Sequence, residues 1–272
     1  MKHCLLLITY VLSRFSSSEG ITYGRITSRT TAPSLALIHI AQDIRHVQSQ
    51  GYAYKLKDEY CTGSLISRQV VITAAHCIRK KSRYSPLQSG EDVALLLLNK
   101  PIKVCEPNEQ EHERIGIVKL PIGNTRYHWT DSDVKSAKCT MFGYGKHERH
   151  SKIDFRLRSM DVNLTTSTAL ITNLTSIQKI CSGDSGGPVI CNRGSTPYLI
   201  GITTSVISSR TSKIPQLCRL RTPDGEYAVV TAAKFYDVRK GVSQILRFLN
   251  VHGQISNMLS DYWKCFKGIH RQ

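Results

Sequence analysis

The chain has 272 residues, with 37 Lys and Arg against 20 Asp and Glu, which gives a formal net charge of +17 at pH 7. This length can bury one or two hydrophobic cores, and the charge favours attraction to polyanions such as glycosaminoglycans, anionic surfaces or nucleic acid. No nucleic-acid fold signature accompanies the charge, which argues against base-specific binding. No segment approaches the roughly 20 uninterrupted apolar residues of a membrane span.

The beginning of the chain has the layout of a signal peptide. Residues 1–18 carry one Lys, then the mainly apolar stretch Cys4–Leu12, then a serine-rich end, and this stretch is too short to cross a bilayer. We therefore expect a secreted, extracellular protein. Removal of Cys4 leaves eight of the nine cysteines, an even number in an oxidising compartment. Sequons at Asn163 and Asn173 then become candidate glycosylation sites.

The pattern of the remaining chain predicts a mostly β protein, because short runs rich in Val, Ile, Leu and Thr alternate with Gly, Pro, Ser and Asn. The expected strands are Leu35–Ala41, Val70–Ala74, Val93–Leu98, Ile115–Leu120, Ala137–Phe142, Val189–Cys191 and Leu199–Val206. Apolar residues at helical period predict a C-terminal helix over about 242–250. Residues 258–272 are expected to form a tail, tethered through Cys265.

One of the ten histidines, His76, comes two residues after the expected strand Val70–Ala74. A β-branched run and two alanines precede it, which leaves room around the ring at the end of a buried strand. Cys77 can pair with Cys61 and fix this corner. Asp92 opens the next apolar strand, where its carboxylate would be partly removed from water. This order favours His76 as a general base and Asp92 as the carboxylate that orients it.

Residues 181–188, Cys-Ser-Gly-Asp-Ser-Gly-Gly-Pro, carry the strongest functional signal. The glycines around Ser185 permit positive φ angles and close approach of a substrate backbone. The amides of Gly183 and Ser185 can then point into one small space, as an acyl-transfer oxyanion requires. Because a serine hydroxyl is a weak nucleophile, it needs a base. The octet predicts Ser185 as a nucleophile served by His76.

Three strings in this order, CTGSLISRQVVITAAHC, EDVALLLL and CSGDSGGP, resemble the chymotrypsin/trypsin family of serine peptidases over about residues 26–250. The order His, Asp, Ser is that of this family and not of subtilisins or α/β-hydrolases. The resemblance implies a triad of His76, Asp92 and Ser185, with an oxyanion hole formed by the amides of Gly183 and Ser185. It implies an all-β fold of two antiparallel β-barrels of the chymotrypsin type, with the active site between them.

The same resemblance implies the domain layout and the disulfides. A signal peptide (1–18) and a propeptide (19–25) would precede a peptidase domain (26–257), with an N-terminal barrel over about 26–125 and a C-terminal barrel over about 126–240. The implied disulfides are Cys61–Cys77, Cys139–Cys191 and Cys181–Cys218, which leaves Cys105–Cys265 as the last pair.

Members of this family are commonly made as zymogens, in which a cut after a basic residue frees an ammonium that pairs with the Asp before the nucleophile. Here the resemblance implies a cut by an activating protease between Arg25 and Ile26, with Asp184 as the acceptor. The usual Ile-Val-Gly-Gly start is replaced by Ile-Thr-Ser-Arg, which removes backbone freedom where the new terminus must fold inward. The alternative is an unprocessed loop.

Two departures from the family pattern concern the first barrel and the specificity pocket. Only fifteen residues separate His76 from Asp92, fewer than in typical relatives, so we expect a reduced first barrel or a sequence that lacks a segment. The residue six before the nucleophile, at the base of the pocket in this family, is Lys179. Like charges about 4 Å apart repel by about 4 kcal/mol at an effective dielectric constant near 20, so cleavage after Arg or Lys is not expected. Thr204 and Val206 belong to one pocket wall, and Val206 replaces a Gly and narrows the entrance.

The pocket leaves three alternatives open: a preference for an acidic residue, a preference for a small or apolar residue, or no productive pocket. The sequence thus predicts a secreted serine endopeptidase that hydrolyses peptide bonds through a Ser185 acyl-enzyme, without a metal or organic cofactor. Its expected partners are a protein or peptide substrate, an activating protease and polyanions. The alternative is a catalytically impaired, secreted relative that binds polyanions or proteins.

Overall fold

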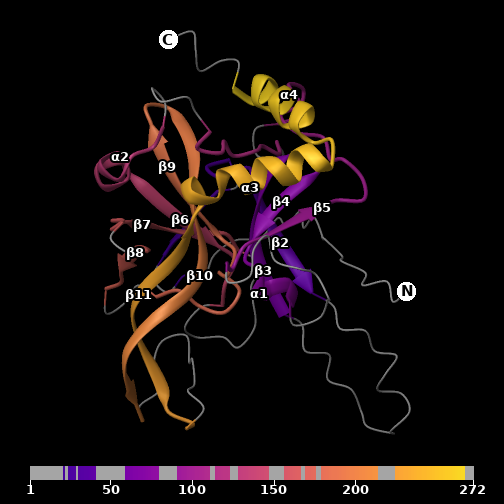
Figure 1. Cartoon of the computed structure of the whole chain (residues 1–272). Coiled ribbons are helices and arrows are strands. Elements are labelled where there is room, and N and C mark those ends of the chain that lie inside the picture. Colours follow the sequence, from indigo (N-terminus) through magenta and orange to yellow (C-terminus); the bar gives the residue numbers. More distant parts are fainter. Residues whose placement is uncertain are drawn as a thin grey trace, which may run out of the picture.

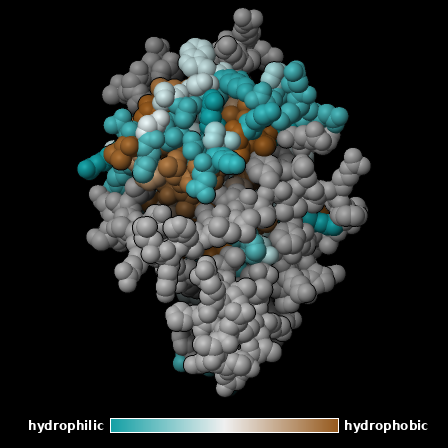
Figure 2. Space-filling model, turned by 90° about the vertical axis from the view of Figure 1, so that its right-hand side faces the viewer, coloured by the Kyte–Doolittle hydropathy of each residue, from teal (hydrophilic) through white to brown (hydrophobic). Residues whose placement is uncertain are grey.

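The computed structural model describes residues 21, 24–28, 30–40, 59–79, 91–110, 114–122, 128–146, 156–166, 169–175, 179–213 and 224–266. Within these ranges the chain forms two antiparallel sheets, followed by two C-terminal helices (Figure 1). None of the described helices is long and apolar enough to cross a membrane. The face in Figure 2 is mainly hydrophilic in its coloured upper part, with hydrophobic residues in small groups between the polar ones.

The first sheet has the strand order β2-β3-β4-β5. Its strands are β2 (Leu35–Ile40), β3 (Glu59–Ser67), β4 (Val70–Thr73) and β5 (Ala94–Leu97). Every residue of β4 is buried, and the short helix α1 (His76–Arg79) follows it. These four strands do not close into a barrel within the described ranges.

The second sheet has seven strands in the order β1-β7-β6-β9-β10-β11-β8, and it is open as well. Its strands are β1 (Arg25–Ile26), β6 (Cys139–Gly143), β7 (Arg158–Val162), β8 (Leu170–Asn173), β9 (Pro188–Arg193), β10 (Thr196–Ser212) and β11 (Tyr227–Asp237). The long strands β10 and β11 form a twisted ribbon that extends away from the body of the molecule (Figure 1). The fold is therefore mostly β and antiparallel, with a helix near the C-terminus, as expected for two β-barrels of the chymotrypsin type, but neither sheet closes into a barrel within the described residues.

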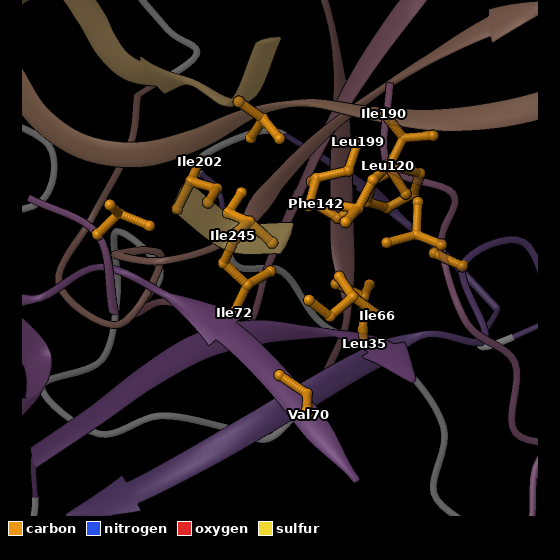
Figure 3. Packing of buried hydrophobic residues seen from close by; sticks show 14 of the residues in the cluster. Leu35, Ile66, Val70, Ile72, Leu120, Phe142, Ile190, Leu199, Ile202 and Ile245 are labelled. Atoms are coloured by element: carbon orange, nitrogen blue, oxygen red, sulfur yellow. The ribbon is translucent and has the colours of Figure 1, made fainter. Parts of the chain in front are cut away.

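A shared hydrophobic core joins the two sheets. Leu35 and Ile72 of the first sheet belong to one buried cluster with Phe142 and Leu199 of the second and Ile245 of helix α3 (Val238–Val251) (Figure 3). Full burial of a side chain of this size contributes about 1.5–3 kcal/mol. This packing fixes the faces of the two sheets against each other and so fixes the groups that lie between them.

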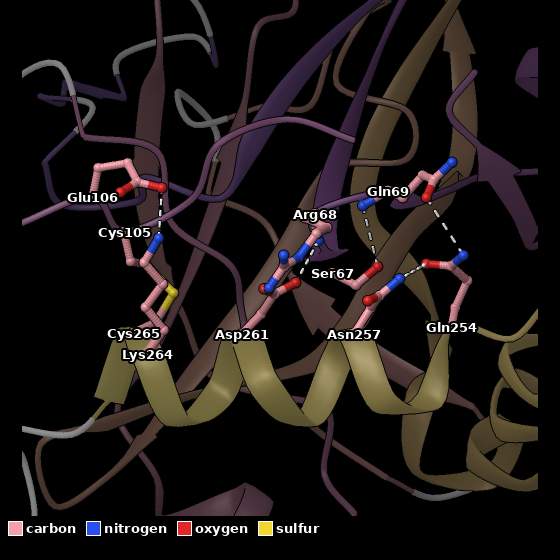
Figure 4. Close-up of polar contacts among 10 residues, drawn as sticks. All are labelled: Ser67, Arg68, Gln69, Cys105, Glu106, Gln254, Asn257, Asp261, Lys264 and Cys265. Atoms are coloured by element: carbon pink, nitrogen blue, oxygen red, sulfur yellow. Dashed lines mark hydrogen bonds and ion pairs between the residues drawn. A yellow bond between two sulfur atoms is a disulfide. The ribbon is translucent and has the colours of Figure 1, made fainter. Parts of the chain in front are cut away.

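Three helices complete the described fold: α2 (Asp131–Ser136), α3 (Val238–Val251) and α4 (Ile255–Phe266). Helix α3 contains the predicted segment 242–250 and begins earlier, because Asp237 caps it by accepting the backbone N–H of Arg239. Where a tail was expected from residue 258, the structure has α4. Asp261 attaches it to the turn between β3 and β4 by accepting hydrogen bonds from Arg68, and the Cys105–Cys265 disulfide attaches it to the segment after β5 (Figure 4).

One predicted strand, Ile115–Leu120, is not a strand. Its only ladder contact with a described residue is a single bridge between Lys119 and Tyr198. The reason lies in its backbone partners, which belong to different parts of the fold. The Gly116 N–H donates to the carbonyl of Pro33, whereas the Lys119 carbonyl accepts from Leu199. The segment is buried and connects the two sheets without pairing along either.

Candidate active site

The ends of two paired strands bring His76 and Asp92 together. His76 begins α1 just after β4, and Asp92 comes two residues before β5, whose Ala94 pairs with Thr73 of β4. Oδ2 of Asp92 lies 2.7 Å from Nδ1 of His76, and Oδ1 accepts the backbone N–H of His76, also at 2.7 Å. With Nδ1 held by the carboxylate, Nε2 of the neutral ring carries the lone pair that a general base uses.

The turn that contains Ser185 lies directly against this corner. The Thr62 N–H donates to the Ser185 carbonyl at 2.8 Å, and Sγ of Cys77 lies 3.9 Å from the same oxygen. Gly186 has a φ of 79°, and a Cβ there would lie 2.0 Å from Oγ1 of Thr73. Only glycine therefore lets the turn approach the first sheet so closely.

Two amides beside Ser185 have no acceptor among the described residues. The N–H groups of Asp184, Gly186 and Gly187 donate to protein carbonyls. Those of Gly183 and Ser185 make no hydrogen bond to the described part of the chain, and Gly183 has a φ of 104°. Two available donors next to a serine hydroxyl are what a tetrahedral oxyanion requires.

Asp184, in the middle of this turn, is completely buried. Its carboxylate accepts the backbone N–H groups of Gly145, at 2.8 Å, and Cys181, at 2.9 Å. Burial raises the pKa of Asp184 to about 7, although the two hydrogen bonds and the charge of Arg158 favour the ionised form. A Cβ on Gly143 would lie 2.0 Å from Oδ1 of Asp184, so the carboxylate fills the space above a glycine.

The expected activation residues lie two strands from this carboxylate. Ile26 of β1 pairs with Arg158 of β7, and Arg158 pairs with Gly143 of β6. Ile26 is 51% exposed, and Arg25 forms an exposed ion pair with Asp161 at 2.9 Å. The predicted cut between Arg25 and Ile26 thus falls on a short edge strand at the surface.

The expected pocket residues come from the turn before Ser185 and from β10. Nζ of Lys179 donates to the carbonyl of Val230 in β11 at 2.5 Å, and the side chain is buried. Burial lowers the pKa of this ammonium. Thr204 donates to the carbonyl of Lys234 at 3.0 Å, and Val206 packs against the core of the second sheet. Lys179 is therefore directed toward β11 rather than toward solvent.

Three disulfides join described cysteines: Cys61–Cys77, Cys105–Cys265 and Cys139–Cys191. These are the same pairs that the sequence analysis names. Cys181 is also disulfide-bonded, and its expected partner Cys218 lies outside the described residues, as does the expected signal peptide. Asn163 and Asn173, the two sequon residues, are both exposed. The Cys61–Cys77 bridge lies beside His76, and because its sulfurs are bonded to each other they are not thiolate ligands for a metal.

Sequence reasoning missed two buried residues beside the site, Thr62 and Arg158. The hydroxyl of Thr62 donates to the Gly183 carbonyl at 2.9 Å, in the turn that contains Ser185 (the nucleophile turn). The charge of Arg158 favours the ionised form of Asp184. Neither belongs to a motif with chemistry of its own. The one feature of the sequence that could have pointed to Thr62 is its place next to Cys61, the cysteine that pairs with Cys77 beside His76.

Comparison with known proteins agrees with this geometry. Residues 40–219, more than half of the chain, match the family described as Trypsin. The chain is 28% identical over 199 residues to a tissue-type plasminogen activator of Sus scrofa, a match that covers 52% of this chain and 34% of that protein. The corresponding protein of Bos taurus is 27% identical over 201 residues, covering 52% and 33%. An ovochymase of Halocynthia roretzi is 24% identical over 215 residues, covering 64% and 13%.

The matches cover about a third or less of the length of these curated relatives. The family itself follows from the match over residues 40–219, which contains the strings around positions 76, 92 and 185. The chain belongs to the trypsin family of serine peptidases.

Proposed function

We propose that the protein is a secreted serine endopeptidase that cleaves peptide bonds through an acyl-enzyme on Ser185. The observation that carries this proposal is the bond of 2.7 Å between Asp92 and Nδ1 of His76, next to a serine turn with two available amide donors. A neutral, correctly oriented imidazole and an oxyanion site are the two parts that acyl transfer by serine needs.

In the first half of the reaction, Oγ of Ser185 attacks the scissile carbonyl carbon and gives its proton to Nε2 of His76. The negative charge on the carbonyl oxygen is accepted by the N–H groups of Gly183 and Ser185. The C–N bond then breaks, and the imidazolium returns the proton to the leaving amine. Asp92 stabilises the imidazolium throughout and stays ionised.

In the second half, a water attacks the ester on Ser185 and gives one proton to His76. The ester bond breaks, Ser185 takes the proton back, and the new carboxyl terminus leaves. Every bond change uses only this chain, the substrate and water.

For specificity, we infer that the pocket prefers an acidic side chain and rejects Arg and Lys. The support is the buried Lys179 ammonium, whose hydrogen bond to the Val230 carbonyl keeps it away from solvent. Burial lowers the pKa of this ammonium, and a substrate carboxylate beside it would favour the charged form. Because Val206 would narrow the entrance of the pocket, we expect Asp to be preferred over the larger Glu.

For activation, we infer that a cut after Arg25 supplies an ammonium at Ile26 that pairs with Asp184. The support is the completely buried carboxyl group of Asp184, because its burial raises its pKa to about 7. An ammonium at this carboxylate would favour the ionised form and order the turn around it.

We also infer that the protein is secreted and binds polyanions. Its disulfides support secretion, because disulfides persist in oxidising compartments. Its net charge of +17 supports binding to polyanions.

Covalent labelling with a fluorophosphonate probe tests the proposed function. The full-length, disulfide-bonded protein would be compared before and after the cut at Arg25, with Ser185→Ala as the control. Labelling that appears after the cut and is lost in Ser185→Ala supports an activatable nucleophile. A folded, correctly cut protein that is not labelled would sink the enzyme proposal, and it would favour a binding protein, which heparin affinity chromatography would then test.

A further inference from the structure

Thr62 occupies the junction between the first sheet, the end of β6 and the nucleophile turn. It lies in β3 and is completely inaccessible to solvent. Its backbone N–H donates to the Ser185 carbonyl at 2.8 Å, and its carbonyl accepts the Thr73 hydroxyl at 2.8 Å. These two bonds use only the main chain of Thr62, so they support the turn even when the side chain is replaced.

The hydroxyl of Thr62 makes two further bonds at the same junction. It donates to the carbonyl of Gly183 at 2.9 Å and accepts the N–H of Tyr144 at 3.0 Å. One oxygen therefore connects the turn that contains Ser185 with the segment at Tyr144 and Gly145. That segment also binds the turn directly, since the Gly145 N–H donates to the Asp184 carboxylate. Buried, fully used hydroxyls of this kind define one geometry, because any displacement leaves a donor or acceptor unpaired.

The bond to Gly183 acts on the part of the turn that matters for an oxyanion. The peptide unit between Gly183 and Asp184 separates the two available amides, those of Gly183 and Ser185. Because a peptide unit is planar, holding its carbonyl fixes the orientation of this middle plane. The two amides belong to the peptide planes on either side of it, so the middle plane is the reference from which both are directed. Gly183, with a φ of 104° and no Cβ, has little steric restraint of its own.

We propose that the Thr62 hydroxyl is a positioning group for the oxyanion site: it holds the Gly183 carbonyl so that the amides of Gly183 and Ser185 converge. This inference rests on the proposed function. Thr62 touches neither substrate nor the reacting atoms, so it acts through the turn. Loss of one oxyanion donor typically lowers kcat by about 10²–10³-fold, and a misdirected donor is expected to lower the rate by about tenfold or more.

The test compares two substitutions at this position in the full-length, cut protein. Thr62→Val removes the hydroxyl with little change of shape, and Thr62→Ser keeps it. Thr172→Val is the matched control, because Thr172 is equally a buried threonine whose hydroxyl bonds a carbonyl, that of Asn163 at 2.9 Å, in β8. Each variant is treated with the fluorophosphonate probe, and the maximal labelling rate, the half-saturating probe concentration and the final labelled fraction are measured between pH 5 and 9.

We expect Thr62→Val to lower the maximal rate at least tenfold, with an unchanged half-saturating concentration and an unchanged pH midpoint of the His76 limb. Thr62→Ser should stay within about threefold of the parent, and Thr172→Val should not change the rate. A structural defect alone would instead lower the final labelled fraction at a normal rate, and that result would overturn the proposal.

Three other outcomes are equally decisive. A Thr62→Val protein that labels at the parental rate would show that the hydroxyl has no positioning role. If Thr62→Val does not fold, Thr62→Ala is measured, and failure of both while Thr172→Val folds would make the hydroxyl a folding determinant and overturn the proposal. Absence of labelling in the parent protein would reject the proposed function itself, which separates the two failures.

Discussion

Asp92 binds His76 at two points, through Oδ2 to the ring Nδ1 and through Oδ1 to the backbone N–H, both at 2.7 Å. The carboxylate thus fixes the ring and the start of α1 together. The pairing of β4 with β5 explains how fifteen intervening residues suffice to build the pair, because it places the end of β4, which precedes His76, beside the start of β5, which follows Asp92.

The first prediction concerns this carboxylate. Asp92→Asn should keep the acceptor for the His76 backbone N–H, so the fold survives, but its amide would favour the wrong tautomer of the ring. We expect fluorophosphonate labelling of Ser185 to slow by roughly 10³–10⁴-fold, as for such a change in a serine triad. Stopped-time labelling measures the rate, and circular dichroism verifies the fold. A variant that labels within tenfold of the parent would remove Asp92 from the proposed triad.

The second prediction concerns the buried Asp184 and the stability of the uncut protein. The carboxyl has a pKa of about 3.9 when unfolded and about 7 in the fold, because burial disfavours its charge. The folded state therefore binds the proton more tightly, so stability from this group is fully present below pH 3.9 and is lost as pH rises through 7. Asp184→Asn loses one of the two acceptor oxygens, which adds a cost that does not vary with pH. We therefore expect the stability of Asp184→Asn relative to the parent to rise across this window, by up to a few kcal/mol.

Urea unfolding of both proteins at pH 4, 5.5 and 7.5 measures this difference. The cut protein provides the control, because an ammonium paired with Asp184 would lower its pKa and abolish the pH dependence of the difference. A difference between parent and Asp184→Asn that stays constant with pH in the uncut protein would contradict the role of burial.

The sequence was sufficient for the parts of the site that lie within short motifs. The residues around His76 and Ser185 are ordered by local chemistry, namely a buried strand end and a glycine-rich turn, so their surroundings could be predicted. Asp92 was predictable from its place before an apolar strand. The support from Thr62 was not, because it depends on contacts with residues far away in the chain.

Helix α4 shows why the expected tail was wrong. Its inner face carries Asp261, which is completely buried and interrupts the apolar period that predicts a helix. The partner that makes this burial acceptable, Arg68, lies 193 residues earlier. A pattern read along the chain cannot contain such a pair. The opposite error occurred at Ile115–Leu120, where a buried apolar run has no continuous ladder partner.

The third prediction concerns this pair. Asp261 accepts the backbone N–H of Arg68 at 2.7 Å and its Nε at 2.8 Å, and a third bond comes from Nη2 (Figure 4). Arg68→Met would leave a buried carboxylate with only the backbone donor. Breaking a buried pair typically costs about 3–5 kcal/mol, and we expect the lower end because the Arg68 side chain is 34% exposed.

Asp261→Asn is the matched variant, because its amide oxygen can still accept one bond and no charge is left buried. Urea unfolding should therefore find Arg68→Met less stable than Asp261→Asn. Equal stabilities would mean that the ion pair contributes no more than its neutral replacement. The Ser185 labelling rate should be normal in both, since α4 makes polar contacts to Arg68, Leu120 and Glu106 among the described residues, away from His76 and the turn that contains Ser185.

The fourth prediction concerns the proposed pocket preference. A peptide library treated with the cut protein should be cleaved after Asp or Glu and not after Arg or Lys, because repulsion of about 4 kcal/mol between like charges near 4 Å corresponds to a discrimination of at least 100-fold. Lys179→Met keeps the length and apolar stem of the side chain but removes the ammonium that donates to the Val230 carbonyl. The variant should lose the acidic preference and cleave after small or apolar residues, with an unchanged fluorophosphonate labelling rate. Cleavage after Arg by the parent protein would show that the Lys179 ammonium does not face the substrate side chain, because two neighbouring positive charges repel each other.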